Sequence, residues 1–252
     1  MYFFAKIFRL RQRAATASTV AVVTLAAMTT LAAAQGVSGD AGAYGRIYGG
    51  LSSIEDMSFA DPATADLTLN GGSGLIFGGA LGYSFGNGFR TELDVARSSA
   101  DLDGALTENV QAFVPCGETP SNPCLDPDID GDYTGWSGMA MAYYEFSTGS
   151  ALMPYIGVGV GLVDVDLEAE TIGRLKDGAS SEFAIVDGSD SEFAYKLAAG
   201  AAYDIGAFDI TLDYSYLRTG RVALDGRSAY TSFIFDRRAN VHSFTVGARA
   251  AF

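Results

Sequence analysis

The chain has 252 residues, of which 30 are acidic and 16 are basic, so its formal net charge at pH 7 is −14. An acidic chain repels polyanions, and this balance argues against a nucleic acid as partner. Beyond the first 34 residues, no apolar run is long enough to form a transmembrane helix. The length that remains suits one domain or one barrel.

Residues 1–34 have the composition of a secretory signal peptide. A basic start without acidic residues is followed by an uncharged stretch rich in Ala, Val and Thr that ends in Ala32-Ala33-Ala34. Cleavage there would leave a mature domain of residues 35–252. The alternative is an uncleaved membrane helix, because residues 14–34 are long enough to span a bilayer.

Eight later segments alternate between apolar and polar or small residues, as β-strands do when their two faces meet different environments. They span residues 44–53, 74–85, 89–98, 133–146, 154–165, 192–203, 208–217 and 241–252. Tight turns alternate with loops of roughly 15 to 35 residues, which is typical of outer-membrane barrels. We therefore predict an all-β fold, an eight-stranded antiparallel up-and-down transmembrane β-barrel with both termini in the periplasm. A soluble lipocalin-type barrel is the alternative.

The last predicted strand has an apolar face that carries Phe244, Val246 and Phe252. It resembles the C-terminal strand of bacterial outer-membrane barrels, and this resemblance implies recognition by the barrel-assembly machinery. Pairing of this strand with the first one closes the barrel, and an open edge in lipid leaves backbone groups unsatisfied. Deleting Phe252 should therefore lower the yield of the folded, heat-modifiable form on gels. An unchanged yield in the membrane would contradict the assembly role.

One hairpin carries a family resemblance. The sequence Tyr143-Tyr144-Glu145-Phe146 is followed by Thr148-Gly149 and by Pro154-Tyr155-Ile156-Gly157-Val158-Gly159-Val160-Gly161. It resembles the hairpin of opacity-type surface proteins, which are outer membrane protein A-like, porin-family barrels of Gram-negative bacteria; Glu145 stands where that family often has Asp. The resemblance implies location in the cell outer membrane, exposure at the surface and interaction with an extracellular or host ligand through the loops. The alternatives are a small-solute or ion channel and, less favoured, a lipid-remodelling enzyme.

The alternation also predicts a charged interior. Nine side chains should point into the barrel: Arg46, Arg90, Glu92, Asp94, Glu145, Lys196, Asp209, Asp213 and Arg249. The interior of an eight-stranded barrel holds side chains and little else, and buried charges persist when they are paired. The set predicts a salt-bridged plug, with an ion path as the alternative.

His242 is the only histidine of the chain. Lipid-modifying barrel enzymes combine a histidine with a serine and an acid, but the adjacent Ser243 should point to the opposite face of the strand. We expect a histidine at the barrel rim without a catalytic role, no catalytic residues and no enzyme activity.

The second long loop, residues 99–132, contains both cysteines. An even number of cysteines in an exported chain predicts a disulfide between Cys116 and Cys124, and its small loop should contribute about 2–3 kcal/mol of chain entropy. The bond would order the tip of the loop more than the barrel. Mass spectrometry of the unreduced protein should find neither thiol alkylated; two alkylated thiols would refute the bond.

The same loop suggests one cofactor. Four aspartates match the opening of an EF-hand calcium loop: Asp126, Asp128, Asp130 and Asp132. Ser137 occupies the twelfth position, where a bidentate glutamate is required. Calcium binding and a solvated acidic turn both remain open, and no other cofactor is expected.

The fourth long loop is basic, unlike the other three. Its arginines are Arg218, Arg221, Arg227, Arg237 and Arg238. They would lie at the level of lipopolysaccharide phosphates, which suit the bidentate guanidinium group. Pairing with the neighbouring acidic loops is the alternative. Outer-membrane lipid and lipopolysaccharide are thus the expected partners in the membrane.

Overall fold

The computed structural model describes residues 41–61, 65–107, 124–174, 180–227 and 232–252. The predicted signal peptide lies outside these ranges and stays a prediction. The described residues form twelve strands: β1 (Ala41–Ile54), β2 (Met57–Asp61), β3 (Ala65–Asn70), β4 (Ser73–Phe85), β5 (Phe89–Thr107), β6 (Cys124–Glu145), β7 (Leu152–Arg174), β8 (Ser180–Asp204), β9 (Asp209–Thr219), β10 (Val222–Arg227), β11 (Ser232–Arg237) and β12 (Asn240–Ala251). Within those ranges no helix is long and apolar enough to cross a bilayer.

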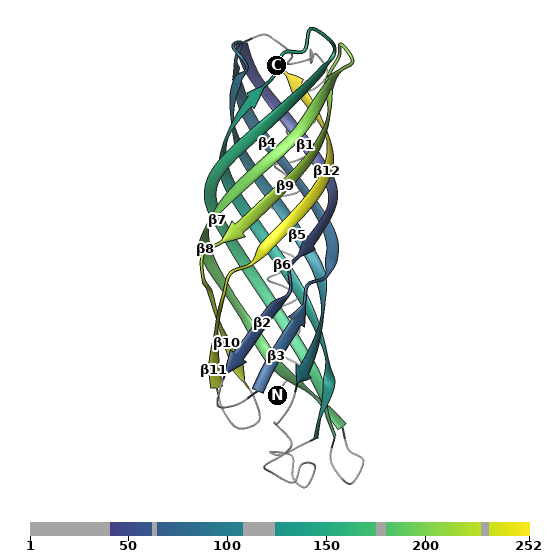
Figure 1. Cartoon of the computed structure of the whole chain (residues 1–252), viewed down its shortest axis with the longest axis vertical. Coiled ribbons are helices and arrows are strands. Elements are labelled where there is room, and N and C mark those ends of the chain that lie inside the picture. Colours follow the sequence, from purple (N-terminus) through teal and green to yellow (C-terminus); the bar gives the residue numbers. More distant parts are fainter. Residues whose placement is uncertain (1–40, 62–64, 108–123, 175–179, 228–231) are drawn as a thin grey trace.

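Eight strands close into an antiparallel barrel in the order β1-β4-β5-β6-β7-β8-β9-β12. The ring closes where β12 pairs with β1, from Tyr44 opposite Ala251 to Ile54 opposite Val241. The C-terminus and the short turns lie at one end of the barrel, and the hairpins β2–β3 and β10–β11 lie at the other (Figure 1). The predicted eight-stranded antiparallel barrel is confirmed.

Glycine makes the short turns possible. Gly86 and Gly88 flank Asn87 between β4 and β5 and have φ angles of 72° and 88°. Residues with a Cβ atom rarely adopt such backbone angles, so the turn requires glycine. The Asn87 side chain completes the turn by accepting a 3.1 Å hydrogen bond from the Phe89 amide.

The outer surface of the closed ring is a band of large apolar side chains. Leu81 and Leu93 are 61% and 69% exposed, and Phe244, Val246 and Phe252 of the assembly segment also point outward. A contiguous apolar surface of this size would be unfavourable in water, whereas lipid hydrocarbon accommodates it. The Phe252 amide still donates a 3.2 Å hydrogen bond to the Ala43 carbonyl, next to the end of the β1–β12 ladder.

The apolar face changes sides partway along β7. Ile156, Val158, Val160 and Leu162 point outward, whereas Val163 and Val165 are buried inside the barrel and Asp164 is exposed. Strand residues alternate between faces, so this one-residue change of phase moves the apolar face from outside to inside. The chain is apolar outside where it meets lipid, and apolar inside where it meets water.

This change of phase corrects the predicted strand ends. The predicted strands stopped near residues 98 and 165 and resumed near residues 133 and 192. In the structure β5 runs to Thr107, β6 starts at Cys124, β7 runs to Arg174 and β8 starts at Ser180. The long connections are therefore largely sheet. Two hairpins, β2–β3 and β10–β11, were also expected as loop.

Candidate functional site

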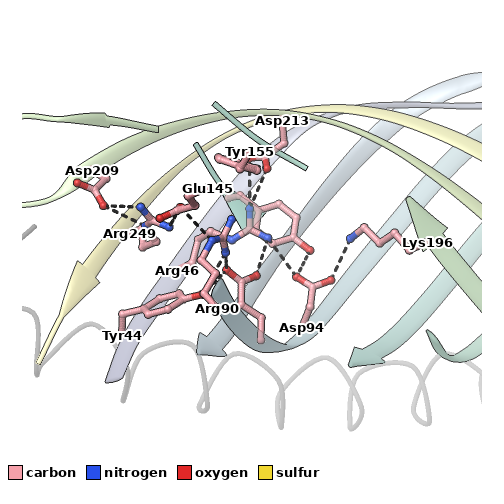
Figure 2. Close-up of polar contacts among 12 residues, drawn as sticks. Tyr44, Arg46, Arg90, Asp94, Glu145, Tyr155, Lys196, Asp209, Asp213 and Arg249 are labelled. Atoms are coloured by element: carbon pink, nitrogen blue, oxygen red, sulfur yellow. Dashed lines mark hydrogen bonds and ion pairs between the residues drawn. The ribbon is translucent and has the colours of Figure 1, made fainter. Parts of the chain in front are cut away.

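All nine charged residues predicted for the lumen lie inside the barrel. Eight of them are at most 6% exposed, and the Glu145 side chain is 11% exposed. They come from six different strands and meet in one network (Figure 2). The cluster contains four bases and five acids, so its charge nearly cancels.

Arg249 of β12 contacts both the adjacent strand and the strand on the opposite side of the ring. Its Nη1 lies 2.5 Å from Oε1 of Glu145, and its Nη2 lies 2.8 Å from Oδ2 of Asp209. Asp209 is its directly paired neighbour on β9, but Glu145 stands on β6, the strand opposite β12 in the ring. A contact between opposite strands crosses the full width of the lumen.

Arg46 on β1 joins carboxylates from both sides of its own strand. Its Nη2 lies 3.1 Å from Oε2 of Glu92 and 3.7 Å from Oδ2 of Asp94, and its Nη1 lies 3.2 Å from Oδ2 of Asp213. A buried carboxylate is costly unless it is paired and hydrogen-bonded, and one guanidinium serves three of them here.

Lys196 approaches the same group from β8. Its Nζ lies 3.0 Å from Oδ1 of Asp94, whose other oxygen accepts a 2.7 Å hydrogen bond from the Tyr48 hydroxyl. Both side chains are buried. Asp94 is therefore held by a lysine from β8 and by an arginine and a tyrosine from β1, which fixes its position in the lumen.

Arg90 is enclosed by aromatic rings. Its guanidinium carbon lies 3.8 Å from the centre of the Tyr143 ring and 4.8 Å from that of Tyr155, a cation–π arrangement. It also contacts Glu92 and lies 3.0 Å from Oε1 of Glu145.

Sequence reasoning overlooked the inward tyrosines Tyr44, Tyr48, Tyr143 and Tyr155. A signal was present, since Tyr44 and Tyr48 flank Arg46 at the same strand parity and Tyr143 precedes Glu145 by two residues. Tyrosine supplies both ring surface and a hydroxyl, and the Tyr155 hydroxyl donates to Asp213. The tyrosines fill the space that the charged groups leave between them.

The network is built to occupy space and to satisfy charge. Its carboxylates are engaged by arginine, lysine or tyrosine, and no group of three or more metal-ligating side chains occurs within the described ranges. Nothing in these contacts activates a nucleophile. The contact between Arg249 and Glu145 places paired side chains across the lumen at this level.

The candidate calcium residues lie in a different setting from the one predicted. Asp126, Asp128, Asp130 and Asp132 belong to β6, where Asp130 pairs with Asp103 of β5 and with Glu170 of β7. The acidic turn that the sequence left open as the alternative to calcium binding does not form, because Asp130 and Asp132 pair with both neighbouring strands and Asp128 pairs with Ala105 of β5. Calcium bound here would need an arrangement other than an EF-hand loop.

Of the predicted disulfide, only one half is described. Cys124 is the first residue of β6 and pairs with Arg174 of β7. Cys116 lies outside the described ranges, so the bond stays a prediction.

The five arginines of the fourth connection are spread over its length. Arg218 belongs to β9 and pairs with Tyr195 and Asn240 on the neighbouring strands. Arg221 and Arg238 are exposed in the links that flank β10 and β11, while Arg227 and Arg237 end those two strands. Val222 pairs with Arg237, so the backbone of Arg221 lies near that of Arg237 and Arg238 at the base of the β10–β11 hairpin, whereas Arg227 lies at its far end.

His242 has partners that the sequence did not reveal. Its Nε2 lies 2.9 Å from Oε1 of Glu55, and its Nδ1 lies 2.8 Å from the Tyr214 hydroxyl. Asn240 donates a 2.6 Å hydrogen bond to the other oxygen of Glu55. The expected rim position holds, and Ser243 is buried on the opposite face. The residues form a hydrogen-bonded chain on the outer surface, above the lipid-facing Phe244.

These hydrogen bonds should make the contact between Glu55 and His242 sensitive to pH. The bonds from His242 and then Asn240 lower the pKa of the Glu55 carboxyl below its ordinary value. Their contribution is therefore present above the unfolded-state pKa of Glu55 and is lost as the pH falls through the lowered folded-state pKa. His242→Ala should raise the pKa of Glu55. A pH titration that follows the carbon-13 NMR signal of the Glu55 carboxyl group measures this change. A pKa that does not move would show that His242 is not responsible.

Comparison with known proteins places this architecture in context. The family model of the outer membrane protein beta-barrel domain matches residues 20–252. An uncharacterised protein of Brucella abortus is 28% identical over 189 residues, which cover 73% of this chain and 63% of that protein, less than two thirds of its length. Outer membrane protein PagN of Salmonella typhimurium is 28% identical over 190 residues, with 70% and 73% covered.

A solved structure agrees at the level of the fold. The outer membrane protein OprG of Pseudomonas aeruginosa superposes with a TM-score of 0.50 at 13% identity, covering 85% of this chain and 98% of that one. Together with the closed ring and its lipid-facing surface, the match to the family model over most of the chain shows where the protein belongs. The chain is a member of the outer membrane protein beta-barrel family and lies in the outer membrane.

Proposed function

We propose that this outer-membrane barrel acts as a surface-interaction protein through the part of its wall that stands beyond the membrane, and not as a conduit through its lumen. The observation that carries this proposal is the contact between Arg249 and Glu145, which joins opposite strands of the ring. A solute would have to displace buried, paired charges in order to pass.

The outward wall supports the same function. The strands β5 to β8 have 19 to 25 residues, whereas a tilted membrane strand needs about 9–11. The additional length carries exposed polar residues such as Asp101, Asp132 and Asp164 above the lipid band. A large folded surface is thereby presented to the exterior on a rigid support.

Conductance and surface exposure test this proposal together. The protein purified from outer membranes should give no steady, well-defined current in planar bilayers. Protease added to intact cells should cleave it only in the connections at the end away from the short turns. A reproducible single-channel current in the wild type would overturn the proposal and favour the channel.

Lipopolysaccharide is the proposed partner within the membrane. Arg218 lies at the outer border of the lipid-facing surface beside Tyr195 and Tyr216, and Arg221 is exposed just beyond it. Guanidinium groups bind phosphate bidentately at such a border. Arg218→Ala should weaken binding of hexa-acylated lipid A in native mass spectrometry more than binding of its dephosphorylated form. Equal effects on both forms would remove the phosphate contact from the proposal.

A lipid-remodelling activity is the second candidate, and one observation favours it. Glu55, His242 and Tyr214 form an acid–imidazole–hydroxyl chain that faces the outer lipid boundary. If His242 carries its proton on Nε2 toward Glu55, Nδ1 accepts from the Tyr214 hydroxyl and could take its proton. Lipid A profiles from cells with the wild type and with His242→Ala distinguish the two functions, since a surface protein leaves both profiles alike.

A further inference from the structure

A row of polar and aromatic side chains crosses three neighbouring strands, β8, β9 and β12, at the outer border of the lipid-facing surface (Figure 1). Tyr195 of β8 is paired with Arg218 of β9, and Arg218 is paired with Asn240 of β12. One row closer to the lipid, Tyr216 is paired with His242. Paired residues point to the same face of a sheet, so these five side chains lie side by side on the outside of the barrel. We call them the border platform.

Hydrogen bonds hold the border platform in one arrangement. Arg218 is hydrogen-bonded to Tyr195 and Tyr216. The Tyr216 hydroxyl donates a 3.1 Å hydrogen bond to Oδ1 of Asn240, and Nδ2 of Asn240 donates a 2.6 Å hydrogen bond to Oε2 of Glu55. Side chains that are already ordered lose little conformational entropy when a ligand binds to them.

The aromatic rings of the platform form a continuous surface. The ring centres of Tyr195 and Tyr216 lie 6.4 Å apart, and those of Tyr216 and His242 lie 5.1 Å apart. Tyr195 is 39% exposed, so a molecule outside the barrel can contact its ring. The face of an aromatic ring carries partial negative charge and attracts C–H groups with partial positive charge, such as those on the face of a sugar ring.

The position of the platform limits what can lie on it. Leu197 follows Tyr195 by two residues toward the short-turn end of the barrel, and Phe244 follows His242 in the same way. Leu197 and Phe244 are exposed on the lipid-facing surface, where acyl chains cover them. The platform is continuous with this surface and therefore faces the headgroups of the outer leaflet.

The charges at the platform favour a sugar headgroup over a bare phosphate. The Arg218 guanidinium group suits a phosphate. Glu55 lies close enough to Arg218 to interact with it electrostatically, and its carboxylate repels a phosphate. Carboxylate oxygens accept several hydrogen bonds, and the hydroxyl and amide N–H groups of an amino sugar can donate them. A phosphorylated amino sugar thus supplies a partner for the arginine, for the carboxylate and for the rings.

We propose that the border platform binds the phosphorylated glucosamine headgroup of a lipopolysaccharide molecule in the outer leaflet. The inference rests on the proposed lipopolysaccharide contact of Arg218 and adds the sugar to it. A sugar ring stacks on Tyr195 and Tyr216, and its hydroxyl or amide groups donate to Glu55. Binding is then specific for the sugar as well as for the phosphate.

Two lipids separate the sugar from the phosphate in an experiment. Hexa-acylated lipid A carries its phosphates on glucosamine, whereas cardiolipin carries its phosphates on glycerol. The protein purified from outer membranes is titrated with each lipid in detergent micelles, and native mass spectrometry measures the affinities. Tyr195→Leu replaces the ring with another apolar side chain. It should weaken binding of lipid A about tenfold and leave binding of cardiolipin unchanged.

Two further variants assign the effect to the ring and to the carboxylate. Tyr195→Phe keeps the ring and should retain the affinity for lipid A. Glu55→Ala removes the acceptor of the sugar and leaves the rings in place. It should weaken binding of lipid A and leave binding of cardiolipin equal or stronger, because a negative charge is lost. Heat-modifiable migration on gels identifies the variants that fold.

Trp136→Leu is the matched control for an aromatic residue at the membrane border. Trp136 is paired with Arg97 of β5 and Asp164 of β7, on the side of the ring opposite β12. Aromatic residues at this level commonly anchor a barrel in the membrane. If anchoring were their whole role, Tyr195→Leu and Trp136→Leu would have the same effect on lipid A, and this result would overturn the inference.

Two other results would also overturn it. Tyr195→Leu could weaken both lipids equally, or a folded Tyr195→Leu could bind lipid A as well as the wild type does. The proposed phosphate contact fails in a different way, when Arg218→Ala weakens phosphorylated and dephosphorylated lipid A alike. The proposed surface function fails through a steady bilayer current, so each of the three proposals can fail by itself.

Discussion

Arg249→Ala should lower the urea midpoint of the refolded protein further than the substitution of any arginine that lies outside the lumen. Arg249 is fully buried and is bound to Glu145 on the opposite strand and to Asp209 on the adjacent one. Removing one partner of a buried pair leaves charge without compensation and typically costs about 3–5 kcal/mol. The same change should raise leak conductance, because a contact across the lumen is lost.

Two variants make this result specific. Arg227→Ala removes an arginine at the end of β10, outside the membrane ring, and should change the midpoint little. The double variant Arg249→Met with Asp209→Leu removes both charges and should recover much of the lost stability. If Arg249→Ala and Arg227→Ala unfold at the same urea concentration, the network does not stabilise the barrel.

Gly157→Ala should destabilise the barrel, although alanine differs from glycine by one methyl group. Gly157 is buried on β7 opposite Tyr143, and a Cβ atom there would overlap the Tyr143 ring. That ring also packs on Arg90, so it cannot move without disturbing the network. Overpacking of this kind costs about 1–3 kcal/mol.

Gly138→Ala is the matched control on the neighbouring strand. Gly138 lies on the exposed face of β6, and a Cβ atom there would meet nothing within 4 Å. This change should leave stability equal or slightly higher, because alanine restricts the unfolded chain. Urea unfolding followed by tryptophan fluorescence compares the two variants. Equal midpoints would mean that the barrel tolerates a Cβ atom at position 157 and that the close contact with Tyr143 does not require glycine.

The barrel and its inward charges could be predicted because strand parity is a local property. Arg90, Glu92 and Asp94 alternate with Thr91 and Leu93, and this pattern alone assigns the two faces of β5. Which base meets which acid depends on how eight strands close around the axis. Arg249 and Glu145 were both predicted to point inward. Their contact, between residues 104 apart in the chain, could not be predicted, because it depends on which strands lie opposite each other in the closed ring.

Two features were beyond sequence reasoning for physical reasons. The outer halves of the strands were taken for loops because the apolar phase reverses between Leu162 and Val163, and an interrupted alternation resembles a strand end. The partner of His242 was also missed, since Glu55 precedes it by 187 residues and approaches it only when the first and last strands of the ring meet. A search for two alternating runs of opposite phase would have found the first feature.

The reversal of phase on β7 also fixes the immersion depth of the protein. If the barrel sank by two residues along that strand, the exposed Asp164 would enter the hydrocarbon, where a charge is costly. If it rose by the same amount, Leu162 would leave the lipid for water. Each residue of travel is about 3.3 Å along a strand, so the vertical position is defined to within a few ångströms. The outer hairpins therefore stand at a constant height above the headgroups, and whatever they contact must come to that height.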